Sequence, residues 1–172
     1  MKIIIDTETT GLSCMDDEIL QLSIIDESGK EIYNSYFKPV RHTEWNAAMA
    51  VNKITPEMVA EAPTFEAELL RINNIMDDVD TIIGYNTLFD TGFLISSGVN
   101  MPYDATLIDI MKDFAPIYGD WDEDKQRYRY QKLAVCADYY NYDWKNDSAH
   151  DSLADCRATL HCYKNIYEKE VV

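Results

Sequence analysis

The architecture of this chain follows from one apolar run that ends in two acids, Ile3-Ile4-Ile5-Asp6-Thr7-Glu8-Thr9-Thr10-Gly11-Leu12. Its β-branched residues predict a buried strand over residues 2–6. Asp6 and Glu8 are two residues apart, so in an extended chain both carboxylates lie on one face and can reach one point. Acids that converge at the end of a buried strand are costly unless a cation compensates their charge. Their oxygens suit Mg²⁺ or Mn²⁺, although two acids at a solvated strand end are the simpler alternative.

The segments that follow carry first strand patterns and then helix patterns. Near-alternate apolar residues at 18–25 and 31–37, on either side of a glycine-containing turn, predict a hairpin. Thr55, which precedes a proline, and Thr64 predict helix starts. The remaining predicted elements are a strand at residues 80–85, a helix capped by Asn86, a strand near 105–108, and helices at 131–140 and 152–167. This order of elements predicts an α/β fold.

Length and composition predict a single domain spanning residues 1–172. A chain of 172 residues, 47% of them hydrophobic, can bury a core without disulfides, and no repeat or linker divides it. The four cysteines form no C-x-x-C pair, so they are expected to be reduced thiols. Two acids interrupt the apolar start of the chain, and no 18-residue apolar stretch follows. We therefore expect a cytoplasmic protein with no membrane partner.

The charge of the chain limits the partners that it can bind. A net charge of −16 and a pI near 4.4 argue against a protein that grips long duplex DNA, because such binding depends on basic side chains. An enzyme that handles only the last few nucleotides of a strand needs few phosphate contacts, and some of its acids can serve as metal ligands. The acidity therefore restricts the contact area on a nucleic acid and leaves nuclease chemistry open.

Two further acids lie at predicted helix starts. Asp90 lies in the segment Gly84-Tyr85-Asn86-Thr87-Leu88-Phe89-Asp90-Thr91-Gly92-Phe93-Leu94, where the helix dipole alone could explain it. Asp155 lies in the segment Ala149-His150-Asp151-Ser152-Leu153-Ala154-Asp155-Cys156-Arg157-Ala158-Thr159. On one helix His150 and Asp155 would point about 140° apart, so His150 is expected to approach from the preceding loop. Asp151 or Ser148 is expected to cap the helix. Taken alone, such a histidine is more often a surface residue than a base.

Together the three motifs resemble those of the DEDD exonucleases, specifically the histidine branch of that family. Asp-x-Glu after a strand, Asn-x-x-Phe-Asp opening a helix and His-x-x-x-x-Asp opening the last helix occur in the family's order and spacing. The likeness covers nearly the whole chain. Within the family, the chain is similar to the proofreading epsilon subunits of bacterial DNA polymerase III. It implies an RNase H-like α/β fold, with a mixed five-stranded sheet flanked by helices. One departure is Asn52-Lys53, where many relatives have a histidine that is credited with a substrate contact.

The resemblance also implies an activity. Asp6, Glu8, Asp90 and Asp155 would bind two Mg²⁺ or Mn²⁺ ions, with His150 as the general base for the attacking water. The implied reaction is 3′–5′ hydrolysis of single-stranded DNA from its 3′ end, releasing 5′-mononucleotides, and a polymerase or repair protein is the implied partner. Two alternatives stay open. One is an exoribonuclease acting on RNA ends or short oligoribonucleotides, like RNase T or oligoribonuclease. The other is a non-catalytic partner subunit, which would not need all four acids and the histidine.

Four residues are candidates for contact with the terminal nucleotide. Thr9 is expected to contact the 3′ hydroxyl and Leu12 to wedge against the terminal base, while Asn86 and Phe89 line the sugar and base. For Leu12 and Phe89, ordinary core packing is an equal alternative.

A charged and aromatic segment, residues 119–130, shows no clean periodicity and is predicted to form a loop or lid near the active site. The densest basic patch surrounds it and consists of Lys112, Lys125, Arg127, Arg129 and Lys132. These side chains are candidates for holding upstream phosphates, although nearby acids weaken their field.

Overall fold

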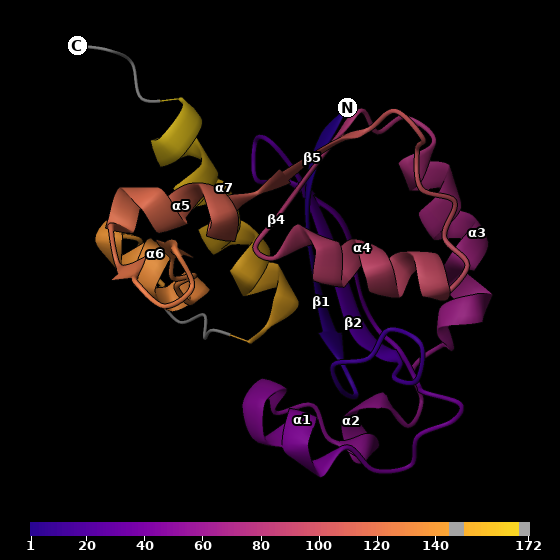
Figure 1. Ribbon diagram of the computed structural model, residues 1–172. Helices are drawn as coiled ribbons and strands as arrows, with labels where there is room; N and C mark the ends of the chain where they lie inside the picture. Colours follow the sequence, from indigo (N-terminus) through magenta and orange to yellow (C-terminus); the bar gives the residue numbers. More distant parts are fainter. Residues whose placement is uncertain (145–149, 169–172) are drawn as a thin grey trace.

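A mixed β-sheet forms the centre of the molecule (Figure 1). The computed structural model describes residues 1–144 and 150–168, and within them five strands are ordered β3-β2-β1-β4-β5. The strands are β1 (Lys2–Thr9), β2 (Ile19–Asp26), β3 (Glu31–Tyr36), β4 (Thr81–Gly84) and β5 (Thr106–Asp109). The first three pair antiparallel, whereas β4 is parallel to β1 and β5 is parallel to β4. The central strand is therefore the one that carries Asp6 and Glu8.

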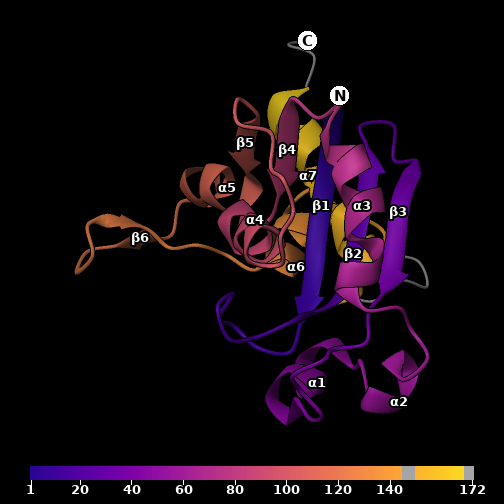
Figure 2. The ribbon, with the colours of Figure 1, turned by 90° about the vertical axis from the view of Figure 1, so that its right-hand side faces the viewer.

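Helices cover both faces of the sheet, because β1 is apolar on both sides. Ile3 and Ile5 point into a core closed by helices α3 and α4, whereas Ile4 points into a second core closed by α5, α6 and α7. Figure 2 shows the two layers on opposite sides of the sheet. The helices are α1 (Asn46–Asn52), α2 (Pro56–Val59), α3 (Phe65–Met76), α4 (Thr87–Ser96), α5 (Ile110–Tyr118), α6 (Leu133–Tyr139) and α7 (Ser152–Tyr167). None of the helices in the described residues is long and apolar enough to cross a membrane.

Most predicted elements are present, with differences at a few boundaries. The bounds of α7 are those predicted, and the hydroxyls of Thr55 and Thr64 cap α2 and α3 as expected. β1 runs to Thr9 instead of stopping at Asp6, because β2 pairs with it through Glu8 and beyond. Asn86 occupies the N-cap position of α4, but its side chain makes no capping hydrogen bond, so that part of the prediction is wrong. Its backbone is left-handed, with φ 73°, and its N–H donates to Asp109 instead.

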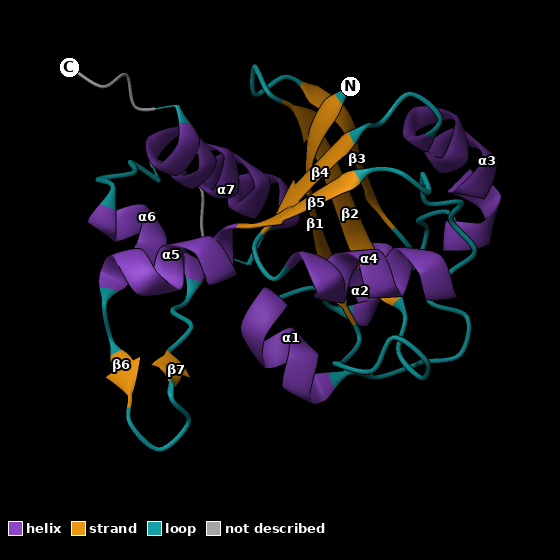
Figure 3. Cartoon of the chain, turned by 45° about the horizontal axis from the view of Figure 1, so that its top comes forward, coloured by secondary structure: helices purple, strands orange, loops and turns teal. Residues whose placement is uncertain are grey.

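The segment predicted as a loop or lid forms a small hairpin. β6 (Trp121–Asp122) pairs antiparallel with β7 (Arg127–Tyr128), and the pair belongs to a sheet of its own. Figures 2 and 3 show this hairpin projecting from the body of the molecule beyond α5 and α6. A helix that the pattern did not predict, α5, precedes it and ends at Gly119, whose φ of 83° a glycine adopts without strain.

Candidate active site

Three elements bring the four acids of the sequence motifs to one end of the sheet. Asp6 and Glu8 lie on one face of β1, Asp90 is in the first turn of α4, and Asp155 is in the first turn of α7. Both helices pack against β1, so their N-terminal turns meet its carboxyl end. Asp90 is 2% exposed and Asp155 is 8% exposed, whereas the two strand acids are partly buried. The acids are therefore grouped in a space that little water can reach.

Thr7 fixes the position of Asp90, although it carries no charge. The backbone N–H and the Oγ1 hydroxyl of Thr7 both donate to Asp90 Oδ1, at 2.9 and 2.8 Å. The alternation of β1 explains this contact, because Thr7 points to the face opposite Asp6 and Glu8, where α4 packs. The sequence pattern gave no role to this threonine, since the contact spans 83 residues.

The start of α7 holds Asp155 and His150 together. The Asp151 carboxylate caps the helix by accepting from the N–H groups of Leu153 and Ala154, both at 3.2 Å, which confirms one of the two predicted caps. The other, Ser148, lies outside the described residues. Ahead of the cap, His150 takes a left-handed backbone with φ 71°, and its N–H donates to Asp155 Oδ2 at 3.1 Å. As expected, His150 approaches from the preceding turn.

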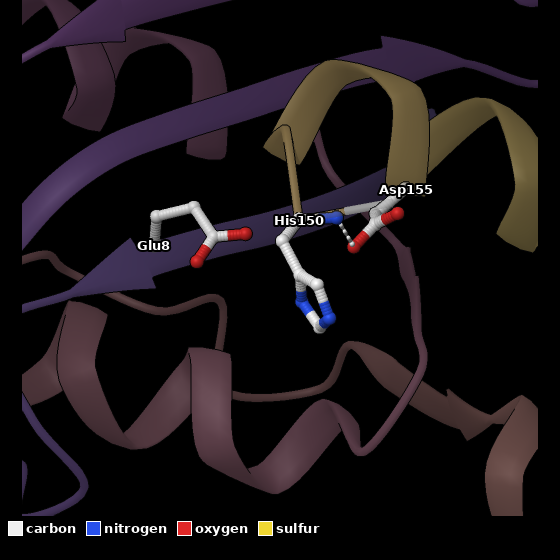
Figure 4. Close-up of side chains that lie close together, drawn as sticks. All are labelled: Glu8, His150 and Asp155. Atoms are coloured by element: carbon white, nitrogen blue, oxygen red, sulfur yellow. Dashed lines mark hydrogen bonds between the residues drawn. The ribbon is translucent and has the colours of Figure 1, made fainter. Parts of the chain in front are cut away.

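Glu8, His150 and Asp155 lie around one point in space (Figure 4). One ligand atom from each, a carboxylate oxygen or a ring nitrogen, lies within 4.8 Å of the other two. The His150 side chain is exposed to solvent, unlike the acid beneath it. It can therefore reach both the acids and a molecule that arrives from solvent.

Crowding in a dry site makes the acids hard to ionise. Burial, together with the charges of Asp155 and Asp90, raises the pKa of Glu8 to about 8. Burial likewise raises the pKa of Asp90 and of Asp155 to about 7, and that of Asp6 well above its usual range. The pKa of His150 is lowered, first by burial and then by the positive charges of Lys132 and Lys53. His150 is therefore neutral at pH 7 and can accept a proton.

The arrangement fits a divalent cation. Among the described residues, Asp155 Oδ1 is buried and has no hydrogen-bond partner, which is costly for a carboxylate oxygen unless a cation approaches it. Carboxylates with one imidazole nearby are hard ligands of the type that Mg²⁺ and Mn²⁺ use. A bound cation would also favour the ionised form of every acid whose pKa burial has raised.

A cavity of about 290 Å³ opens beside Glu8, between the end of β1 and α1. Of the four residues predicted to contact a terminal nucleotide, Thr9, Leu12 and Phe89 line this cavity, whereas Asn86 does not. Leu12 is 88% exposed, so core packing does not explain it. Phe89 lines the cavity and also packs against the core, because the centroid of its ring lies 4.9 Å from that of Phe93.

Hydrogen bonds to the Asp17 carboxylate hold the loop that carries Leu12 in place. The Asp17 carboxylate accepts from the Ser13 N–H at 2.9 Å and from the Thr10 hydroxyl at 3.2 Å. A side chain at Gly11 would meet this carboxylate, so Asp17 would have to move and give up these hydrogen bonds to admit one. The wall of the cavity is therefore a fixed part of the fold.

Asn52 is a site residue whose role the sequence did not reveal. Its side chain donates to the Thr9 carbonyl at 3.2 Å, accepts from the Ile54 N–H at 3.1 Å and hydrogen-bonds Glu8, which lowers the pKa of that acid. It is 6% exposed and lines the cavity. The only sequence signal was the departure from the family pattern.

Comparison with known proteins agrees with the geometry. The sequence model of the exonuclease family matches residues 3–163. The uncharacterized exonuclease CP81 of Escherichia phage 186 is 30% identical over 167 residues, covering 92% of this chain and 84% of the phage protein. The PolC-type DNA polymerase III of Oceanobacillus iheyensis is 32% identical over 94 residues, covering 54% of this chain but only 6% of the polymerase. The chain belongs to the exonuclease family, and within it to the DEDD class of 3′–5′ exonucleases acting on nucleic acid.

Solved structures show the same fold. Exonuclease X in complex with 5′ overhanging duplex DNA matches with a TM-score of 0.72 at 21% identity, covering 98% of this chain and 92% of that one. Escherichia coli Exonuclease I in complex with a dA16 oligonucleotide matches with a TM-score of 0.75 at 22% identity, covering 96% of this chain and 41% of that one. The fold is the RNase H-like fold of these exonucleases, as the sequence motifs implied.

The raised pKa values predict how the stability of the metal-free protein depends on pH. Between about pH 4 and 8 the folded protein holds protons on Glu8, Asp90 and Asp155 that the unfolded chain has released, so its free energy of unfolding falls as pH rises. One pKa unit corresponds to about 1.4 kcal/mol, so we expect a loss of at least about 2 kcal/mol between pH 5 and 8. Thermal melts with a chelator should show a falling Tm, and Mg²⁺ should raise the Tm more at pH 8 than at pH 5. Equal gains from Mg²⁺ at both pH values would contradict this account.

Proposed function

We propose that residues 1–172 form one exonuclease domain that removes nucleotides singly from the 3′ end of single-stranded DNA, with two divalent ions held by four acids. The observation that carries the proposal is the convergence of Asp6, Glu8, Asp90 and Asp155 from three elements, with His150 at the mouth of the site. Two divalent cations balance the negative charges of the four carboxylates. A group of buried acids without such balance would be a liability to the fold.

Different residues of the protein activate the water and position the acids. When bound, the two ions would supply charge stabilisation at the attacking and leaving oxygens of an in-line displacement. His150, neutral at pH 7, takes the proton of the attacking water. The Asp155 carboxylate fixes the backbone of His150 through the 3.1 Å hydrogen bond, and Thr7 fixes Asp90 through two. Cleavage with transfer of the water oxygen to phosphorus releases a 5′-mononucleotide and leaves a new 3′ hydroxyl.

The cavity beside Glu8 supports an exonuclease rather than an endonuclease. Its volume, about 290 Å³, is at the small end of ligand sites and suits one terminal nucleoside. Leu12 and Phe89 offer apolar surface to the base, and Thr9 lies next to Glu8, where a 3′ hydroxyl would be bound. Residues of α1 form one wall of this cavity, which favours the end of a strand over its interior.

Relatives support DNA as the substrate and a replication or repair protein as a partner. The matching Exonuclease I and Exonuclease X structures contain DNA, and several matching sequences are DNA polymerase III proteins. The chain covers a small share of the polymerases, so association with a polymerase remains part of the proposal.

The test of the proposed function compares end-labelled substrates of one sequence: linear single-stranded DNA, its circular form and the matching RNA, each with Mg²⁺, Mn²⁺ or a chelator. We expect mononucleotides from linear DNA with either metal, and no product with the chelator. Cutting of the circle as fast as the linear strand would contradict the exonuclease assignment. Faster release from RNA than from DNA would replace the DNA assignment by the exoribonuclease one.

A further inference from the structure

The β6–β7 hairpin carries exposed aromatic rings, although the chain as a whole is strongly acidic. Trp121, Tyr128 and Tyr130 are 41%, 37% and 44% exposed. Trp121 and Tyr128 are opposite each other in the register, and their rings meet edge to face with centroids 5.0 Å apart. That pair has a structural purpose, since a cross-strand aromatic pair stabilises a two-stranded ribbon that has no core of its own. Tyr130 lies beyond the paired residues, so it has no partner across the ribbon and does not stabilise the ribbon in this way.

The cations of the hairpin are of two kinds. Arg129 is neutralised by Asp122, with Nε 3.2 Å from the carboxylate. By contrast, neither Lys125 nor Arg127 has an ion pair with any carboxylate of residues 1–144 or 150–168. The Arg127 guanidinium lies over the ring of Tyr130, 5.0 Å from its centroid. Lys125, Arg127 and Tyr130 line one open cavity of about 590 Å³, together with the Asp122–Arg129 pair and Asp124, so two cations without an ion pair and a ring face the same space as one unpaired acid.

The base of the hairpin is anchored at Tyr85, beside the carboxyl end of β4 and five residues ahead of Asp90 in the sequence. After Tyr130 the chain passes Gln131, whose carbonyl accepts from Tyr85 Oη at 2.9 Å, just beyond the end of β4. The next residue, Lys132, occupies the N-cap position of α6. Between the tip of the hairpin and this anchor point, cations and rings alternate along Arg127-Tyr128-Arg129-Tyr130. Figure 3 shows the hairpin extending outward from this end of α5 and α6.

We propose that the hairpin is an arm that binds the unpaired part of the substrate strand on the 5′ side of the scissile bond. Bases stack on Tyr130, and Lys125 and Arg127 contact phosphates. Cations that follow the backbone, combined with rings on which bases stack, are the general means of holding single strands without sequence preference. Paired bases have no free face to offer a ring, and the acids near the hairpin tip, Glu123 and Asp124, disfavour a broad duplex contact. This inference rests on the proposed function.

The first experiment neutralises the two free cations with Lys125→Gln and Arg127→Gln together. The salt dependence of binding to a fluorescein-labelled 20-nucleotide oligothymidylate is then followed by anisotropy in a chelator. Each phosphate contact on a single strand contributes about 0.7 to the slope of log affinity against log salt, so the slope should fall in magnitude by about 1.4. Lys30→Gln is the matched control, because Lys30 is exposed on the β2–β3 turn, at the opposite end of the sheet from Glu8. It should leave the slope unchanged.

The second experiment separates the arm from the active site by substrate length. Tyr130→Ala should raise the KM for the 20-nucleotide strand by about 5- to 150-fold, the cost of losing one stacked base, without changing kcat. A trinucleotide, too short to reach the arm, should be cleaved with wild-type constants. Tyr103→Ala, which removes a fully exposed ring elsewhere, is the control.

The outcomes are distinct. If the wild-type protein cleaves neither substrate, the proposed function fails, while the anisotropy slope still reports on the arm. A wild-type slope and KM in the hairpin variants would show that the arm does not touch the strand. An equal rise in KM for the trinucleotide and for the 20-nucleotide strand would show that the substitution disturbs the fold instead. An equal loss of affinity for a 20-base-pair duplex would overturn the preference for unpaired strands.

Discussion

Replacing Asp90 by asparagine is expected to slow nucleotide release by about a thousandfold and to raise the Tm of the metal-free protein. The asparagine Oδ1 can accept the same two hydrogen bonds from Thr7, at 2.9 and 2.8 Å, so the position of the side chain is kept. What is lost is one negative charge in the proposed metal site. Charge stabilisation by bound cations is worth several kcal/mol, and each 1.36 kcal/mol corresponds to tenfold in rate. The buried charge is also a cost to the metal-free fold, because burial raises the pKa of Asp90 to about 7.

The measurement pairs single-turnover kinetics with titration of Mn²⁺ and with thermal melts in a chelator. Asp104→Asn, at an exposed acid on the loop before β5, is the matched control and should change neither the rate nor the Tm. An Asp90→Asn protein with full activity and unchanged metal affinity would remove Asp90 from the ligand set.

Replacing His150 by alanine is expected to slow the reaction by about 10²- to 10⁴-fold while leaving metal binding intact, the typical cost of losing a general base. The backbone N–H that donates to Asp155 is retained, so the metal site keeps its geometry. Hydroxide from solvent should substitute for the missing base, so the residual rate should rise with pH across 6 to 9. The wild-type rate should change little above pH 7, because its imidazole, with a lowered pKa, is already neutral there.

The left-handed backbone at His150 requires a second variant. With φ at 71°, alanine is strained, whereas asparagine adopts this conformation several-fold more readily. His150→Asn therefore removes the base without the strain, and we expect it to be as slow as His150→Ala. Recovery of activity in the asparagine variant would show that the alanine defect came from the backbone, and a wild-type rate in both would reduce His150 to a surface residue.

The sequence was most informative where local pattern and chemistry agree. The alternation along β1 predicts that Asp6 and Glu8 share a face, and the capping residue Asp151 predicts the start of α7. Both are properties of neighbouring residues, so no knowledge of the fold is needed. The convergence of these acids with Asp90 and Asp155 came from the family resemblance, because no local rule joins residues that are about 80 to 150 positions apart.

The features that were missed depend on contacts distant in sequence or on unusual backbone. The Thr7–Asp90 hydrogen bonds and the Asn52–Thr9 hydrogen bond join separate elements, and neither residue carries a charge that would draw notice. Helix α5 contains Pro116, which has no N–H to donate to the carbonyl four residues earlier and therefore argues against a helix in the sequence pattern.

The connection of the hairpin to the rest of the fold has a consequence for evolution. The Arg129 N–H donates to the Asp120 carbonyl at 2.8 Å, so the chain leaves and re-enters the body at neighbouring points. Residues 121–128 can therefore be lengthened, shortened or exchanged while both attachment points stay where they are, because surface loops with adjoining ends tolerate insertion. If the hairpin binds the strand as proposed, changes confined to residues 121–128 would alter the preference for strand length while the residues of the active site stay the same.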